Sequence, residues 1–268
     1  MNTSRLKNIV IAILALVNLF LLALLLARSV QEHNVRTRTE TQLIQLYAAS
    51  GVELPASLIP KETPHLAPAD PARSLDAEAA LAGAILGDCA AEDAGGGIYR
   101  YHGEAGTCLI RASGVIEASL ERAVDDPETF FEGLFSAFGY AALYSDLQDD
   151  GTGTVTAVRM LPGGMVFNAR LELSFTKNVL TSVTGAFVPA VEAPEGENRI
   201  SGVTALVRFL DYSNSSGEVC TAVTDVRSGY LLQSTASASQ RLLPAWSITT
   251  DVNQYYINMN NGEVTREA

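Results

Sequence analysis

The stretch GGGIYRYHGEAGTCLIRASGVIEASLERA, from Gly95 to Ala123, alternates apolar and polar residues between turns that are rich in glycine. A period of two residues is typical of strands that bury one face, and glycine allows the tight turns between them. The stretch therefore predicts three short antiparallel strands.

A helix is predicted immediately before these strands. Ser74 can cap its first turn, Asp76 and Glu78 place negative charge at its N-terminus, and Gly87 ends it. Its apolar face is formed by Leu75, Ala79, Leu81, Ala82, Ile85 and Leu86.

The same order, a helix followed by strands, recurs twice more along the chain. Pro127 begins a second predicted helix, which Gly139 or a nearby residue ends, while Ser201 caps a third. The strands predicted after these helices cover residues 154–161, 165–175 and 179–187, then 218–232, 240–250 and 253–258. The sequence therefore predicts the α+β class, with repeated units in which a helix packs across an antiparallel sheet.

Residues 9–27 read IVIAILALVNLFLLALLLA, an apolar run that carries no charge and one polar residue, Asn18. At about 1.5 Å per residue, a helix of this length spans roughly 28 Å, which is close to the thickness of a bilayer core. The alternative is a cleaved signal peptide, but the run is long for one and no small-x-small cleavage site follows it before Arg28. The sequence favours a retained N-terminal transmembrane helix ahead of the repeated units.

Basic residues flank this segment on both sides, because Arg5 and Lys7 precede it and Arg28, Arg36 and Arg38 follow it. Charge counting alone therefore does not decide the orientation. The stub before the segment is too short to be a domain, and a signal anchor is compatible with export of the large region behind it. We expect a single-pass protein of the cell membrane, with its N-terminus in the cytoplasm and its C-terminal region outside.

One face of the predicted transmembrane helix carries a stripe of residues spaced by three and four positions, which makes it a candidate partner-binding site. An interhelical hydrogen bond from an amide in hydrocarbon contributes about 0.6 to 2 kcal/mol, enough to bias helix pairing. The other interpretation is an asparagine that an apolar anchor tolerates without a dedicated partner. The stripe consists of Ile11, Leu14, Asn18, Leu21 and Leu25.

These patterns divide the chain into five segments. A density of five prolines between Pro55 and Pro71 excludes a helix or a central strand there and predicts a linker. The expected segments are a cytoplasmic stub at 1–8, the transmembrane helix at 9–27, a juxtamembrane helix and proline-rich linker at 28–72, an extracytoplasmic region of two repeats at 73–192, and a C-terminal unit at 193–268.

The formal net charge of −12 would repel phosphate backbones, which argues against a nucleic-acid partner. Three cysteines, Cys89, Cys108 and Cys220, are spaced too widely for a zinc site or for CxxC chemistry. A disulfide between Cys89 and Cys108 and buried free thiols are both compatible with the sequence.

No motif for nucleophilic, phosphate-binding or dinucleotide chemistry occurs in a suitable context, so we expect neither an enzyme nor a cofactor. His33, His65 and His102 fall in three different kinds of predicted segment, which argues against a zinc triad or a catalytic histidine.

A cluster of acids, Asp146, Asp149 and Asp150, is similar to the start of a calcium loop. The twelfth position of that loop would need a Glu and is Ala157 instead. A solvated hairpin turn is the favoured interpretation.

The end of the chain, residues 242–268, reads LLPAWSITTDVNQYYINMNNGEVTREA, with Pro-Ala-Trp before a strand, a Tyr-Tyr strand and an Asn-Gly-Glu-Val ending. This pattern resembles the closing hairpin of PepSY-like and YycI-like extracytoplasmic proteins. The short basic N-terminus, the apolar segment, and then Arg73, Glu78 and the Leu86-Gly87 pair resemble the YycI and YycH regulators of Gram-positive bacteria. The architecture is similar along most of the chain, whereas specific residues match in these two patches.

The resemblance implies PepSY-like or cystatin-like units and regulation in place of catalysis. It implies a non-enzymatic membrane-anchored regulator of a two-component sensor histidine kinase, WalK-like, that acts through transmembrane and extracytoplasmic contacts. A homologous single-pass regulator is the second implied partner.

A binding module is the alternative function: a PepSY-like region that inhibits a peptidase or binds a cell-envelope ligand. Trp246, Tyr255 and Tyr256 in the C-terminal hairpin are then a candidate partner-binding surface, since aromatic residues are favoured at interfaces. The alternation of strand faces places at least one of the two tyrosines in the core. A core role for Trp246 is the favoured competing interpretation.

Overall fold

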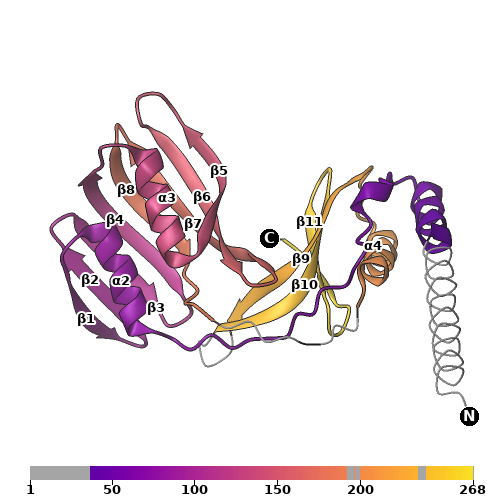
Figure 1. Cartoon of the computed structure of the whole chain (residues 1–268), viewed down its shortest axis with the longest axis horizontal. Helices are drawn as coiled ribbons and strands as arrows, with labels where there is room; N and C mark the ends of the chain where they lie inside the picture. The colour runs from indigo at the N-terminus through magenta and orange to yellow at the C-terminus, as the bar shows by residue number, and fades with distance from the viewer. Residues whose placement is uncertain (1–36, 192–195, 197–199, 235–239, 268) are drawn as a thin grey trace, which may run out of the picture. The chain divides into compact units, whose positions relative to one another are not determined.

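A computed structural model describes residues 37–191, 196, 200–234 and 240–267 of the chain (Figure 1). The chain divides into two compact units, Met1–Ile59 and Pro60–Ala268. In the first unit the described residues form a helix over residues 37–49 and a short 3-10 helix, η1 (Ala56–Leu58).

None of the helices in the described ranges combines the length and the apolar character that crossing a membrane requires. The transmembrane helix predicted at residues 9–27 lies outside the described residues, as do all five residues of its stripe: Ile11, Leu14, Asn18, Leu21 and Leu25.

Within its described residues, the second unit contains three α-helices, and each is followed along the chain by four strands. In chain order the elements are α2 (Leu75–Leu86), β1 (Cys89–Gly95), β2 (Ile98–Gly103), β3 (Gly106–Arg111), β4 (Val115–Ala123), α3 (Pro127–Phe138), β5 (Tyr140–Leu147), β6 (Gly153–Leu161), β7 (Gly164–Thr176), β8 (Val179–Ala186), α4 (Gly202–Ser216), β9 (Val223–Ser234), β10 (Gln240–Thr250), β11 (Gln254–Asn258) and β12 (Val264–Arg266).

All twelve strands belong to one sheet. Its main path is β1-β2-β3-β4-β8-β7-β9-β10-β11-β12, and β6 branches from β7 and pairs with β5. The strands pair antiparallel except β7 and β9, which run parallel through two residue pairs, Met165 with Gly229 and Val166 with Tyr230.

The fold-class prediction, an N-terminal transmembrane helix followed by repeated helix-plus-antiparallel-sheet units, is wrong, because the described strands form one large mixed sheet. The first two sets of strands share a ladder through β4 and β8, and β7 joins the third set through β9. Apolar alternation shows which face a strand buries, but it does not identify the distant strand with which it pairs. The local sequence pattern therefore could not show whether the three sets of strands form separate sheets or one sheet.

The predicted starts of the three helices and the predicted ends of the first two are confirmed. Ser74 Oγ accepts a hydrogen bond from the Ala77 backbone N–H at 3.2 Å, and Ser201 Oγ does the same for Thr204 at 3.2 Å. Gly139 ends α3 with a φ of 68°, in the left-handed region that glycine enters without a steric penalty.

Helices α2 and α3 pack against one face of the sheet formed by β1 to β8 and share a single apolar core with it (Figure 1). Its centre includes Leu81 of α2, Ile110 of β3 and Leu173 of β7, all fully buried. Burial of each such side chain contributes about 1.5 to 3 kcal/mol. A smaller cluster, formed by Phe167, Ala245 and Tyr256, packs β7 against β10 and β11.

The proline-rich segment before α2 is tied to this sheet. Ala69 exchanges two backbone hydrogen bonds with Leu242 of β10, at 3.0 and 2.7 Å. Pro68 and Pro71 flank this bridge, and because proline has no backbone N–H, the pairing does not extend into a ladder.

Candidate functional site

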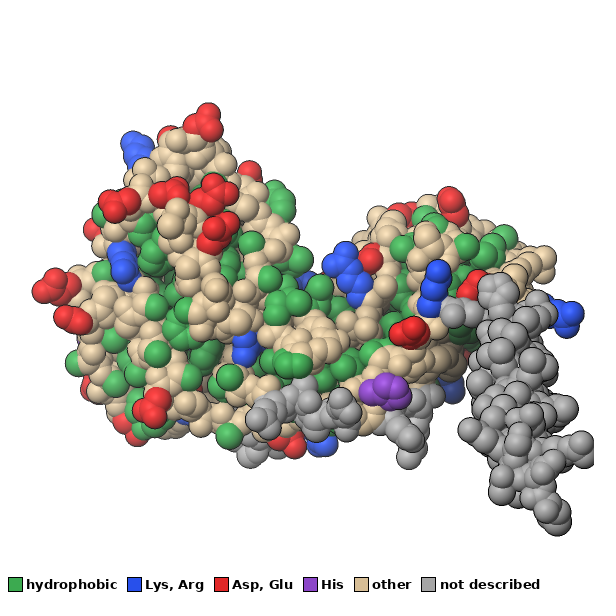
Figure 2. Space-filling model, in the orientation of Figure 1, with side chains coloured by type: hydrophobic (Ala, Val, Ile, Leu, Met, Phe, Trp, Pro, Cys, Tyr) green, Lys and Arg blue, Asp and Glu red, His purple; other side chains and the backbone are tan. Residues whose placement is uncertain are grey.

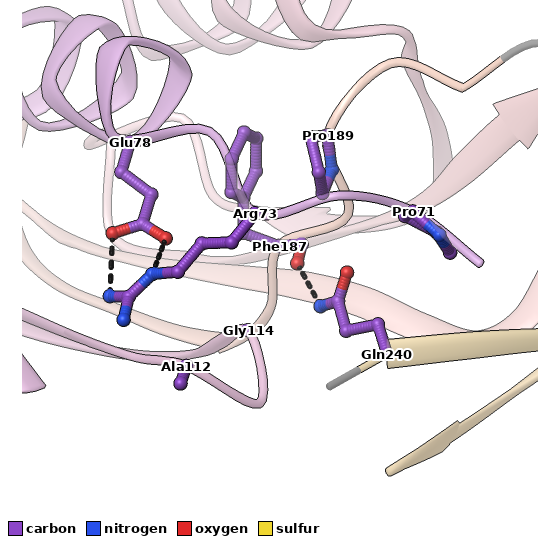
Figure 3. Close-up of a pocket in the computed structure, with 8 residues that line it drawn as sticks. All are labelled: Pro71, Arg73, Glu78, Ala112, Gly114, Phe187, Pro189 and Gln240. Atoms are coloured by element: carbon purple, nitrogen blue, oxygen red, sulfur yellow. Dashed lines mark hydrogen bonds and ion pairs between the residues drawn. The ribbon is translucent and has the colours of Figure 1, made fainter. Parts of the chain in front are cut away.

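Arg73 and Glu78 form an ion pair at the start of α2 (Figure 3). Arg73 donates from Nε to Glu78 Oε1 at 2.7 Å and from Nη2 to Oε2 at 2.9 Å, a two-pronged geometry that suits a carboxylate. Arg73 Nη1 also donates to the Gly97 carbonyl at 2.9 Å, and the guanidinium lies 5.1 Å from the centre of the Tyr99 ring. The hydrogen bond to Glu78 raises the pKa of Arg73, so the guanidinium keeps its positive charge.

A small pocket lies beside this ion pair, with a volume of about 40 Å³. That volume admits about a few water molecules, whereas pockets for organic ligands occupy roughly 300 to 1,000 Å³. The lining residues come from the proline-rich segment, α2, the β3–β4 turn, the segment after β8, and β10: Pro71, Arg73, Glu78, Ala112, Gly114, Phe187, Pro189 and Gln240.

Gln240 joins β10 to the other side of this pocket. Its amide Nε2 donates to the Phe187 carbonyl at 2.6 Å (Figure 3). The same nitrogen donates to the Ser113 carbonyl at 3.1 Å. The side chain is buried, and from a strand of the third set it satisfies one carbonyl in the β3–β4 turn and one directly after β8. The pocket is therefore a packed junction within the second unit.

Arg159 of β6 is a buried cation that contacts carbonyl groups. It donates from Nη1 to the Phe138 carbonyl at 2.6 Å and to the Gly139 carbonyl at 2.8 Å, and it lies 5.7 Å from the centre of the Tyr140 ring. Burial lowers the pKa of Arg159. Its position at the C-terminal end of α3, where the helix dipole is negative, compensates for that burial and gives it a capping role.

The structure buries all three aromatic residues of the predicted C-terminal surface, each between 2% and 4% exposed. Trp246 Nε1 donates to the Ile200 carbonyl at 3.0 Å, and the Tyr255 hydroxyl donates to the Glu218 carboxylate. Burial, and then this hydrogen bond, raise the pKa of Tyr255 to about 12. Tyr256 stacks on Phe167 with ring centres 5.5 Å apart. A partner could reach these rings only after the hairpin had opened.

The cysteines and histidines do not come together in the described ranges. Cys89, Cys108 and Cys220 are free thiols, and β2 separates the strands of the first two. Two strand spacings amount to about 9.5 Å, too far for a disulfide. His102 lies 3.5 Å from Glu92 in an exposed pair, and within the described ranges no group of three potential metal ligands assembles.

The strand β5 forms an open edge of the sheet. It pairs with β6 alone among the described strands, through seven residue pairs that are interrupted by a bulge at Leu143. All six residues from Ala141 to Asp146 are exposed. Among them, Leu143 is 47% and Tyr144 is 60% exposed, so this edge presents large apolar side chains to solvent.

The sequence pattern did not predict β5, because a strand that buries neither face has no apolar alternation. The available signal was the apolar tetrapeptide Ala-Ala-Leu-Tyr between the end of a helix at Gly139 and an acidic turn.

An acidic turn adjoins one end of this edge. Asp146 ends the exposed run, and Asp149 and Asp150 lie in the turn to β6. Asp150 Oδ1 accepts from the Thr152 backbone N–H at 2.9 Å, which fixes the turn. In Figure 2, acidic side chains gather at the top of the part of the molecule formed by α3, β5 and β6.

Comparison with known proteins places the chain in no family. No protein-family model matches it, and no curated protein matches it either. Among solved structures, it is similar to an uncharacterized protein from Eubacterium rectale, with 12% identity over 72% of this chain and 81% of that chain and a TM-score of 0.46. It is also similar to the YpeB C-terminal domain of Bacillus megaterium, with 10% identity over 75% of this chain and 100% of that chain and a TM-score of 0.36. At these identities and TM-scores, neither likeness supports an argument about function.

Proposed function

We propose that this chain is a non-enzymatic regulatory protein that is held at the outer side of a membrane and binds another membrane protein. The open edge of β5 carries the proposal, because a strand that is paired on one side alone and has exposed apolar side chains is a site at which another chain can pair. The uncharged run at residues 9–27 supports attachment to a membrane.

The proposed partner is a sensor histidine kinase of the WalK type. The resemblance of Arg73, Glu78 and the Leu86-Gly87 pair to YycI and YycH regulators supports this choice. The stripe around Asn18 supplies a second proposed contact, within the membrane.

A binding module that inhibits a peptidase or binds a cell-envelope ligand is the second candidate. One observation favours it: the open edge belongs to Pro60–Ala268, a compact unit that does not include residues 9–27. Binding at the β5 edge therefore does not require the apolar segment to be part of the same unit.

Photocrosslinking in the native cell tests both candidates. Probes at Asn18 and Tyr144 are compared with two controls. Val17 would face another side of the predicted helix, and Val252 is 61% exposed in the loop before β11. We expect a sensor kinase at Asn18 and Tyr144 but at neither control.

A peptidase captured from Tyr144, with nothing specific at Asn18, would support the binding module. Absence of any specific membrane protein at both positions would contradict the proposed regulator.

A further inference from the structure

We infer that β5 binds an extended segment of its partner by strand addition, and that this segment is apolar at one end and carries Lys or Arg at the other. The inference rests on the proposed function in one respect, namely that the chain works by binding a protein.

The backbone of β5 supplies the first part of the argument. An edge strand directs alternate N–H and C=O groups away from its single neighbour, where an added strand can pair with them. Four consecutive residues, Tyr144 to Leu147, keep a regular register with β6 after the bulge at Leu143. This run is long enough to align a short extended peptide.

The other sheet edges formed by the described strands are shorter or more highly charged than β5. β12, at the end of the main path, is three residues long, and β1 carries Glu92 and Asp93 with a bulge beside them. Short length, charge and bulges are the usual defences of a sheet edge. β5 has eight residues, a bulge and one charge, at Asp146.

The side chains of β5 supply the second part. Neither face of the strand is covered between Ala141 and Asp146, although four of these residues are apolar or aromatic. Exposed apolar side chains that gather on one element mark an interaction site, whereas single ones are common on any surface. An added strand would bring its own apolar residues against Leu143 and Tyr144.

The acidic residues next to β5 determine which charge we expect at the other end of the partner segment. Asp146, Asp149 and Asp150 lie within five positions, and the nearby turn between β7 and β8 contributes Lys177, whose backbone N–H donates to Thr152. The excess of acid favours a segment with basic residues there. A second copy of the chain would bring another net charge of −12, which disfavours self-pairing.

A peptide titration tests the inference with the whole chain. The probe is a short fluorescent peptide of alternating Val and Thr that ends in three Lys, compared with the same peptide ending in three Glu. Both are also made with the charged end first, because a strand can add in either direction. We expect saturable binding of a Lys peptide at low salt and weaker binding of its Glu counterpart.

Two matched triple variants locate the charge contact. D146N/D149N/D150N removes three charges at β5, and E92Q/D93N/E104Q removes three at β1 and the β2–β3 turn. Since an exposed ion pair contributes about 0.2 to 1 kcal/mol, the first variant should weaken the Lys peptide about tenfold, and the second should leave its affinity close to that of the unaltered chain.

Hydrogen exchange then locates the strand. Bound peptide should slow exchange of amides within β5 and leave those of β1 unchanged. Equal loss of affinity in both triple variants, protection at another edge, or no saturable binding would overturn the inference.

Self-association gives a further outcome. A dimer that is lost on Tyr144→Lys but kept on Val252→Lys would assign the edge to a second copy and overturn the proposed partner. The peptide experiment does not depend on the identity of the natural partner. Peptide binding at β5 can therefore be observed even if no kinase is captured, so strand addition and kinase regulation are tested separately.

Discussion

The ion pair between Arg73 and Glu78 shows how single residues fix the start of α2. The Glu78 side chain is 5% exposed and the Arg73 side chain 26%, so the carboxylate depends on its partner for compensation of its charge. Arg73→Leu should therefore lower the free energy of unfolding by about 3 kcal/mol. Urea denaturation near neutral pH measures this change.

The double variant Arg73→Leu with Glu78→Leu is the control for that experiment. It removes both charges and fills the space with apolar atoms, so it should recover most of the lost stability. An Arg73→Leu variant as stable as the unaltered chain would show that the pair contributes nothing.

For single residues, the sequence predicted the helix caps but not the side chains that bond to distant parts of the chain. Ser74 and Gly139 act within one turn of their own positions, and both were predicted. Arg73 and Gln240 hold carbonyls that are distant in the chain, and no local pattern reveals such contacts. Trp246 was given a core role by the favoured interpretation, and the structure buries it.

Among the elements, helix α3 carries a pH dependence through its N-terminal cap. Asp126 caps α3, accepting from the backbone N–H groups of Glu128 and Thr129 and from the Thr129 hydroxyl. These bonds, led by the Thr129 hydroxyl, lower the pKa of Asp126 below its ordinary value of 3.8. A lowered pKa in the folded chain gives stability that is complete above the ordinary value and is lost as the pH falls through the folded one.

Asp126→Asn should therefore change the pH profile more than the stability near pH 7, since Asn caps helices about as well as Asp. Thermal unfolding from about pH 7 to about pH 2 should show the unaltered chain losing more stability below the ordinary Asp pKa than the Asn variant does. Parallel profiles for the two proteins would contradict the assignment.

The strand β5 should contribute little to stability through its exposed side chains. Tyr144→Lys should change the free energy of unfolding by less than about 0.5 kcal/mol, because the ring is 60% exposed. Leu173→Ala, on the fully buried face of β7, should cost about 2 to 5 kcal/mol. A large loss from Tyr144→Lys in chemical denaturation would show that the edge has a structural role instead.

The molecule as a whole depends on a narrow joint in its sheet. β7 and β9 meet at two residue pairs, and Gly229 makes the close approach possible, since an added Cβ would lie 2.3 Å from the Met165 carbonyl oxygen. Gly229→Ala should push the strands apart and destabilise the chain by about 1 to 3 kcal/mol.

Two probes can show whether that joint couples the third set of strands to the others. Trp246 is the single tryptophan of the sequence and reports on β10, whereas far-ultraviolet circular dichroism reports on all elements. In Gly229→Ala the two unfolding curves should separate along the denaturant axis. Gly133→Ala, inside α3 with open space for a Cβ, should keep them together and add about 0.5 to 1 kcal/mol. Coincident curves for Gly229→Ala would contradict the coupling.

Long-range pairing is where sequence-based prediction failed. Helix positions and most strands followed from periods of 3.6 and 2 residues, but the joining of all strands into one sheet depends on pairs such as β4 with β8, which are more than 50 residues apart. β1 and β5 were not predicted, because they lie at edges of the sheet and their side chains are mostly exposed. The candidate site therefore lay where the local signal is weakest.

The bridge between Ala69 and Leu242 also has a mechanical consequence. A pull on the chain from the side of Pro60 would reach two backbone hydrogen bonds at Ala69 before it reached the ion pair of Arg73. The prolines on either side keep the segment extended and leave it little slack. Tension would therefore pass first to β10. Only after the two hydrogen bonds between Ala69 and Leu242 had broken would it pull directly on the first turn of α2.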